Sequence, residues 1–315
     1  MSSLNNIIAI GRSRYLYDGI KHLVSKGYSC KAIVTEEAYE EYDIKHHDFE
    51  LLAAQIDARF FMMKSLNHEE LIRIIKDNKI RAGISVNWKY TIQKSFLDLF
   101  ECGILNFHLG NLPDYKGNAT VNWTIINGED KIYGNVHKMD PILDAGDVIS
   151  RKAIPITDQT YIGDILKQAA LDVPYLYEEA LQRVLEQPDV FEIKGSLHGL
   201  RCYPRLPEDS QLNWNESAEY ISRLIRASSE PYSGAYSFLN GEKITIWKAS
   251  VFNNSEKFLA LPGHVIGIQK ESKAIQVACG KGMLEIQEIE YRGKKMPPAE
   301  FIKSIRVRFK QINHA

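Results

Sequence analysis

The first hundred residues repeat one pattern, in which a short apolar run precedes a stretch with apolar residues at helical spacing. Residues 6–10 form the first run, and Leu16, Ile20 and Leu23 then share one face of a predicted helix. The strands expected from this pattern are 6–10, 30–34, 59–63, 82–86 and 103–107, with further helices near 71–75 and 94–100. Strands that alternate with helices predict a mostly parallel, Rossmann-like α/β sheet with helical crossovers.

The pattern of predicted strands and helices changes in the second half of the chain. A helical stretch from Tyr161 to Leu185, which Pro174 should kink or restart, leads to a polar, proline-bearing segment at 203–210. After a helix at 217–227, short apolar runs predict strands near 243–247, 264–268, 274–277 and 283–286. We therefore expect two domains: 1–203 with the Rossmann-like sheet, and 204–315 with a leading helix and a small OB-like β-barrel.

Composition narrows the functional classes. Of 315 residues, 44% are hydrophobic and 25% charged, and 39 Lys and Arg oppose 40 Asp and Glu. This balance argues against a protein that coats nucleic acid or an anionic membrane. The apolar run at 7–10 is too short for a signal peptide or a membrane span, so we expect a cytoplasmic protein. Cys30, Cys102, Cys202 and Cys279 lie far apart, which predicts reduced, buried thiols and no metal site.

Two other features resemble a dinucleotide site and a metal site, but each lacks residues that such a site needs. The turn after the first strand reads Gly11-Arg12-Ser13-Arg14, so it lacks the glycine series that brings a dinucleotide pyrophosphate close to the backbone. The adjacent pair His46-His47 has no matching carboxylate or cysteine pattern, and we expect it in a solvated loop.

Chemistry concentrates in two segments of the middle of the chain. Asn106 and His108 alternate with apolar residues at the end of a predicted strand, so both side chains point to one side. In open α/β sheets that end faces the ligand crevice. Asp144 lies in a turn that Gly146 permits, which brings a carboxylate near the same place.

An amide, an imidazole and a carboxylate form a plausible set for acyl transfer to an amine. His108 would take the proton that the attacking amine loses, a contribution of roughly 100- to 10,000-fold. Asn106 would stabilise the oxyanion of the tetrahedral intermediate, by roughly 100- to 1,000-fold. Asp144 would orient the imidazole and stabilise its cation. Each residue alone has a structural alternative, such as a turn cap, so only the set supports this prediction.

The arrangement resembles the 10-formyltetrahydrofolate-dependent formyltransferase family, over nearly the whole chain. The matching residues are Asn106, His108, Leu112, Pro113, Tyr115, Gly117, Asp144 and Gly146, followed by Trp123, Asn127, Gly128 and His137. The family's two-domain members join a Rossmann-like catalytic domain to a β-barrel. Two residues depart from the pattern: Gly110 replaces a common Ser, and Lys116 replaces a common Arg.

The resemblance also implies binding residues, and it implies no metal. The folate pterin is expected near the loop 85–92 and the turn before Asp144, with contacts from Trp88, Tyr90, Ile92, Met139 and Asp140. Trp88 and Tyr90 could equally be core aromatics. Tyr115 and Lys116 are the candidate substrate-binding residues, with Lys116 as a point charge for a phosphate.

The family's acceptors differ in the surface they need. Enzymes that formylate methionyl-tRNA carry a basic insertion after the second strand, whereas residues 36–50 here hold seven acidic residues and Lys45. Segments 207–214 and 228–238 resemble nucleotide-sugar N-formyltransferases, including the formyltransferase domain of the lipid A aminoarabinose enzyme. One feature could favour tRNA instead: the basic run at 292–310 is either an RNA-facing stripe or a solvated barrel edge.

These observations favour transfer of formyl from 10-formyltetrahydrofolate to the amine of a nucleotide-linked amino deoxysugar, for lipopolysaccharide, O-antigen or other surface glycan synthesis. UDP-, dTDP- and GDP-sugars all stay open, and no nucleic acid or membrane partner is expected. The alternatives are methionyl-tRNA formyl transfer and a formyl-folate sensor without catalysis. The single-domain glycinamide ribonucleotide enzymes do not match the barrel. A homodimer is expected from the family only.

Overall fold

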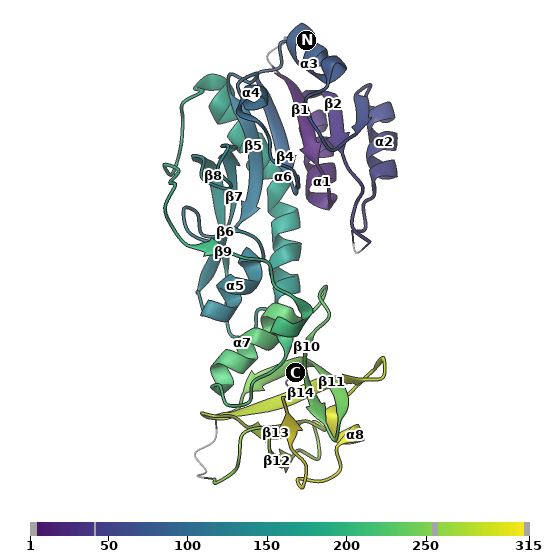
Figure 1. Cartoon of the computed structure of the whole chain (residues 1–315), viewed down its shortest axis with the longest axis vertical. Helices are drawn as coiled ribbons and strands as arrows, with labels where there is room; N and C mark the ends of the chain where they lie inside the picture. The colour runs from purple at the N-terminus through teal and green to yellow at the C-terminus, as the bar shows by residue number, and fades with distance from the viewer. Residues whose placement is uncertain (1–4, 41, 254–257, 312–315) are drawn as a thin grey trace. The chain divides into compact units, whose positions relative to one another are not determined.

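The computed structural model describes residues 5–40, 42–253 and 258–311, which form two compact units (Figure 1). The first unit comprises residues 1–117, 132–154 and 167–202, and the second comprises 118–131, 155–166 and 203–315. The second unit thus includes two short segments, 118–131 and 155–166, that lie between parts of the first unit along the chain. The division into domains 1–203 and 204–315 stays a prediction.

The first unit is built on a seven-stranded sheet in the order β3-β2-β1-β4-β5-β7-β8. Its strands are β1 Asn6–Gly11, β2 Ser29–Thr35, β3 Arg59–Met62, β4 Ala82–Val86, β5 Gly103–Leu109, β7 Lys131–Lys138 and β8 Val148–Pro155. Strands β1 to β5 pair in parallel, and β7 pairs antiparallel with β5. The prediction of a Rossmann-like, mostly parallel sheet is confirmed.

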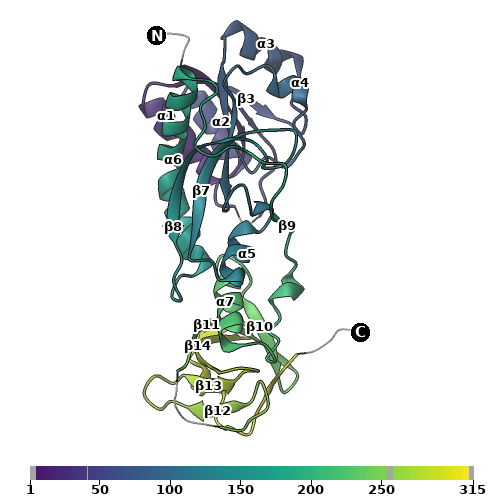
Figure 2. The same ribbon diagram turned by 90° about the vertical axis from the view of Figure 1, so that its left-hand side faces the viewer.

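Helices cover both faces of this sheet (Figure 2). They are α1 Arg14–Ser25, α2 His46–Gln55, α3 Glu69–Asp77, α4 Lys94–Leu97 and α6 Ile162–Glu186. Residues of α3 and α4, among them Leu71 and Phe96, share one buried cluster with Ile8, Ile10 and Ile104 of the strands. Helix α1 packs beside α6, where the Gly19 backbone lies against the ring of Tyr177.

Two local features differ from those expected. Helix α6 is continuous through Pro174, so the alternative in which the proline restarts the helix was wrong. Its buried face, which includes Val173, Leu176 and Tyr177, provides packing that outweighs the proline penalty of roughly 3 kcal/mol. His46 and His47 lie in the first turn of α2 rather than in a loop.

The second unit contains a curled antiparallel sheet in the order β12-β13-β14-β11-β10-β16, with β15 paired to β14. Its strands are β10 Ala235–Leu239, β11 Glu242–Val251, β12 Val265–Ile268, β13 Ile275–Ala278, β14 Met283–Tyr291, β15 Lys294–Met296 and β16 Phe309–Lys310. Helix α7, Ala218–Ser228, packs on this sheet and against α5, Thr120–Asn127. The curled sheet confirms the predicted barrel-like fold, although β10 was not among the predicted strands.

Short elements complete the chain. Strands β6 (Lys116–Gly117) and β9 (Arg201–Cys202) form a two-stranded parallel sheet, Pro207–Ser210 is a 3-10 turn, and α8 is Pro298–Phe301. All four cysteines are free and buried, as predicted, and burial raises the pKa of Cys30 and of Cys279 to about 12. Within the described residues, no helix combines the length and apolar character needed to cross a membrane.

The close approach of β1 and β4 depends on Gly11. Its φ is +131°, and a Cβ at this position would lie 2.0 Å from the Val86 carbonyl oxygen. We expect Gly11→Ala to destabilise the protein by about 3 kcal/mol or more in urea denaturation followed by circular dichroism. Gly27 also has a positive φ of +90° but no neighbour within 4 Å, so Gly27→Ala should cost only about 1 kcal/mol. Equal losses in the two variants would contradict this explanation.

Candidate active site

The antiparallel register of β5 and β7 brings four polar side chains together. Asn106 lies opposite His137, and His108 lies opposite Asn135. Because side chains two residues apart share one face of a sheet, all four belong to the same face at the end of β5. The predicted proximity of Asn106 and His108 follows directly from this register.

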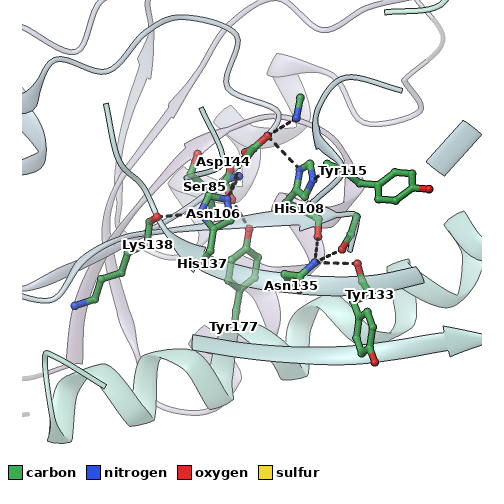
Figure 3. Close-up of polar contacts among 12 residues, drawn as sticks. Ser85, Asn106, His108, Tyr115, Tyr133, Asn135, His137, Lys138, Asp144 and Tyr177 are labelled. Atoms are coloured by element: carbon green, nitrogen blue, oxygen red, sulfur yellow. Dashed lines mark hydrogen bonds and ion pairs between the residues drawn. The ribbon is translucent and has the colours of Figure 1, made fainter. Parts of the chain in front are cut away.

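The carboxylate of Asp144 joins the two histidines (Figure 3). Its Oδ2 lies 3.5 Å from His108 Nδ1 and accepts a hydrogen bond from the Gly117 amide at 2.9 Å. Its Oδ1 lies 3.5 Å from His137 Nε2. The predicted trio of Asn106, His108 and Asp144 is therefore assembled around a fourth residue, His137.

The backbone and the electrostatics both adapt to this carboxylate. Asp144 has a left-handed φ of 54°, and the backbone at Gly146 passes so close to the Lys138 carbonyl that a Cβ would lie 1.8 Å from its oxygen. Burial would raise the pKa of Asp144, but the charge of His108, the contact with His137 and the Gly117 amide together hold that pKa well below its usual value. Asp144 is thus ionised in the folded protein at neutral pH.

His137 fixes the orientation of the Asn106 amide. Its Nδ1 lies 2.9 Å from the Lys138 carbonyl oxygen, which can only accept, so Nδ1 carries a proton. Its Nε2 lies 3.1 Å from Asn106 Nδ2 and 3.5 Å from Asp144 Oδ1. The amide nitrogen of Asn106 therefore faces His137, and because this nitrogen carries two N–H groups, it keeps one for another acceptor.

His108 is held by the loop that leaves β5. It is buried, and its Nε2 donates to the Tyr115 carbonyl at 2.8 Å. Tyr115 is itself buried, with a left-handed φ of 54°. Gly110 is required for this contact, because a Cβ there would lie 2.6 Å from both His108 Nε2 and the Tyr115 oxygen.

Asn135 fixes the backbone beneath this loop. Its buried amide nitrogen lies within hydrogen-bond distance of three carbonyl oxygens, which share its two N–H groups: His108 at 3.1 Å, Gly110 at 2.6 Å and Tyr133 at 3.0 Å. A single side chain from β7 thereby ties together the end of β5 and the start of the loop. We expect this to limit motion of His108 relative to Asp144.

The residues predicted to bind folate lie in two environments. Trp88 and Met139 pack against the buried cluster that contains Ile92. Trp88 and Ile92 also line a cavity of about 290 Å³, and the buried Trp88 Nε1 has no hydrogen-bond partner among the described residues. The ring of Tyr90 lies edge-on to Trp88, whereas Asp140 is exposed and accepts a bond from the Ile142 amide.

Lys116 has an unexpected position. Its side chain is 1% exposed, and Nζ donates to the carbonyl oxygens of Ser196 and His198, at 2.6 Å each. In this structure the ammonium therefore holds the segment 196–198 instead of facing solvent. A substrate role for Lys116 and for Tyr115 stays a prediction.

His137 and Asn135 were not assigned roles by sequence reasoning. His137 was noted only as part of the family resemblance. The available signal was the alternation of Asn135, Val136 and His137, which puts both polar residues on one face of a strand. The strand register that brings them to Asn106 and His108 is not visible in either segment alone. Among the described residues, no group of His, Cys, Asp and Glu is arranged to hold a metal ion.

Family models match both halves of the chain. A formyl transferase model covers residues 7–181, and a model of the formyl transferase C-terminal domain covers residues 206–306. The chain belongs to the formyl transferase family.

Solved structures share the fold of this formyltransferase at low identity. An N-formyltransferase from Helicobacter canadensis, in complex with folinic acid and dTDP-3-aminofucose, has a TM-score of 0.65 and 15% identity over 89% of this chain and 98% of its own. HypX from Aquifex aeolicus, in complex with tetrahydrofolic acid, has a TM-score of 0.59 and 16% identity over 93% of this chain. The formyltransferase spans only 46% of the HypX chain.

A methionyl-tRNA formyltransferase from Clostridium thermocellum also shares the fold, with a TM-score of 0.53 and 17% identity over 80% of this chain and 95% of its own. The fold is thus common to proteins whose names give different acceptors. It does not distinguish among the acceptors of this formyltransferase.

The lowered pKa of Asp144 predicts an acid-dependent contribution to stability. The pKa is lower in the folded than in the unfolded chain, so the ionised carboxylate stabilises the fold above about pH 4, and this contribution is lost as pH falls toward the folded-state pKa. We expect wild type to melt at a higher temperature than Asp144→Asn at pH 7, with the gap narrowing from pH 4 to pH 3. A gap that stays constant from pH 7 to pH 3 would contradict the assignment.

Proposed function

We propose that this formyltransferase moves the formyl group of 10-formyltetrahydrofolate to the amino group of a nucleotide-linked amino deoxysugar, in the cytoplasm, for surface glycan or lipopolysaccharide synthesis. The observation that carries the chemistry is the buried cluster in which Asp144 contacts His108 and His137 while His137 orients Asn106. This cluster has the groups that formyl transfer to an amine requires.

The proposed reaction begins when the amine nitrogen attacks the formyl carbon and forms a C–N bond. The free N–H of Asn106 stabilises the resulting oxyanion. His108 takes the proton that the amine loses and returns it to N10 of the folate as the C–N10 bond breaks. The products are the formamide and tetrahydrofolate. Ionised Asp144 stabilises the His108 cation during transfer.

The proposed base requires one change at His108. In the structure Nε2 carries the proton donated to Tyr115, and Nδ1 faces Asp144. For Nε2 to accept a proton from the amine, the ring must instead hold its proton at Nδ1, toward Asp144. The Tyr115 carbonyl then gives up its hydrogen bond to the imidazole, and the incoming amine replaces it.

The cavity beside Trp88 supports binding of the folate that donates the formyl group. A buried indole N–H without a partner is costly, by roughly 1–3 kcal/mol, and such a group suits a ligand with a hydrogen-bond acceptor. The cavity volume of about 290 Å³ is at the lower end of the range for small-molecule sites. The Helicobacter protein and HypX were solved with folates, which supports a folate for this chain too.

The acceptor side has support from a second cavity, of about 340 Å³, within the second unit. Its lining includes Ser210, Ser228 and Tyr232, from the two segments that resemble nucleotide-sugar enzymes, and Arg205, which lies just before the first of them. Arg205 forms no ion pair with a carboxylate among the described residues, and its buried Nε has no partner there. Its other nitrogens bond to Ser228 Oγ, Ser210 Oγ and the Asp209 carbonyl. An arginine without a counter-ion among hydroxyls suits a phosphate.

Methionyl-tRNA is less well supported. In the acidic segment 36–50, Glu36 pairs with Arg12 at 3.3 Å and Asp43 pairs with Arg14 at 2.6 Å, while Glu37, Glu40 and Glu50 are exposed. In the basic run 292–310, Arg292 and Lys295 are paired with glutamates. Exposed acidic side chains repel the phosphates of RNA, and a basic run that is partly paired with glutamates attracts them less. Both features weaken the case for an RNA-binding surface.

A parallel assay tests the proposal. The enzyme is given 10-formyltetrahydrofolate with a panel of UDP-, dTDP- and GDP-amino sugars, or with methionyl-tRNA, and product mass is measured. We expect one added formyl group on a sugar nucleotide, and His108→Ala should lower kcat by about 100-fold or more while the circular dichroism spectrum is kept. Formylation of the tRNA alone would overturn the sugar assignment, and full activity of His108→Ala would overturn the mechanism.

The Arg205 cavity gives a separate prediction. Loss of a charge-assisted contact worth about 1.5–3 kcal/mol should raise KM for the sugar nucleotide roughly 10- to 100-fold in Arg205→Gln, with kcat and the folate KM nearly unchanged. The control is Arg201→Gln, an exposed arginine outside the lining of this cavity. A folded Arg205→Gln protein with the wild-type KM would exclude this cavity as the phosphate site.

A further inference from the structure

A buried tyrosine from α6 reaches the sheet beneath the candidate active site. Tyr177 is fully buried, and its hydroxyl donates to the Ser85 carbonyl of β4 at 2.5 Å (Figure 3). Burial raises the pKa of Tyr177, so the hydroxyl stays protonated. One phenol group from α6 is therefore bonded to the backbone at the end of β4.

This bond lies beside a critical place in β5. Ser85 and Asn106 form the last register pair of β4 with β5, and Phe107 separates Asn106 from His108. The backbone that Tyr177 holds is thus paired directly with the backbone of Asn106.

The surroundings of the ring leave little room for another arrangement. The Gly19 backbone of α1 lies against the ring, and a Cβ there would be 3.0 Å from Tyr177 Cδ2. A larger residue at position 19 would push the ring away from the strands. Loss of the Tyr177 hydroxyl would leave the buried Ser85 carbonyl without this hydrogen bond. A buried polar group that loses its partner costs roughly 1–3 kcal/mol of stability.

We propose that Tyr177 is a positioning residue for formyl transfer: its hydroxyl fixes the end of β4, which pairs with β5 at Asn106, so that Asn106 and His108 keep their reactive geometry. The inference rests on the proposed function. Misplacement of catalytic groups by about 1 Å lowers rates by roughly 100-fold, so a smaller shift of β5 lowers kcat by less. Substrate affinity is not expected to change, because Tyr177 is fully buried and lines neither cavity.

The first test compares Tyr177→Phe with Tyr175→Phe. Tyr175 lies on the same helix but is 64% exposed, and its ring contacts His22. We expect kcat of Tyr177→Phe to fall about tenfold with both KM values within twofold, and Tyr175→Phe to match wild type. In an Asn106→Ala background, Tyr177→Phe should lower kcat by a smaller factor than in wild type, because only the effect through His108 is left. An equal fall in both backgrounds would make Tyr177 a structural residue only.

A second measurement is independent of activity. In protein labelled with ¹⁵N-histidine, Tyr177→Phe should shift the imidazole signals of His137 and His108, and Tyr175→Phe should shift only that of His22. If wild type transfers no formyl group, the proposed function fails, while these spectra still decide whether Tyr177 positions the site. Unmoved His137 and His108 signals would overturn the inference.

If Tyr177→Phe does not fold, Gly19→Ala provides the same test. Alanine favours the helix by about 1 kcal/mol, yet its Cβ displaces the Tyr177 ring. A lower kcat in a protein of unchanged or higher melting temperature, with shifted His137 and His108 signals, would support the proposal. Wild-type kcat and signals would contradict it.

Discussion

The buried carboxylate of Asp144 is the contact on which the site depends. A charge in this environment is unfavourable unless it is neutralised and hydrogen-bonded. Its neighbours are two imidazoles and the Gly117 amide, which come from β5, β7 and the end of the loop after β5. Because each partner belongs to a different segment, the same contact that satisfies the charge also fixes the segments relative to one another. The site is thereby organised before substrate arrives, which is the condition for electrostatic stabilisation of a transition state.

The reversal of direction at β7 makes this arrangement possible. Strands β1 to β5 are parallel, and a parallel neighbour would have been reached through a crossover with a different register. Antiparallel β7 instead pairs Asn106 with His137 and His108 with Asn135. A slip of one residue would turn His137 and Asn135 to the opposite face, so the buried polar pairs and the apolar core select one register together.

The sequence predicted most of the fold because its strands are continuous apolar runs, and alternation alone placed Asn106 and His108 on one side. Asp144 was reached through the family resemblance as well as its turn. His137 and Lys116 show where prediction from local pattern ends. The role of His137 follows from the β5–β7 register, and the burial of Lys116 follows from carbonyls 80 and 82 residues away. The continuity of α6 through Pro174 has a similar cause, since packing of the helix outweighs the local preference of the proline.

The departure at position 110 is connected to the loop geometry around His108. A Cβ at Gly110 would lie 2.6 Å from His108 Nε2 and from the Tyr115 oxygen, which are hydrogen-bonded to each other. With serine there, the imidazole and this carbonyl would have to separate or the loop would have to shift. Glycine therefore permits the hydrogen bond between His108 Nε2 and the Tyr115 carbonyl. This Nε2 is the nitrogen that takes the proton in the proposed reaction. In the proposed reaction, access of the amine to His108 therefore requires displacement of the Tyr115 carbonyl.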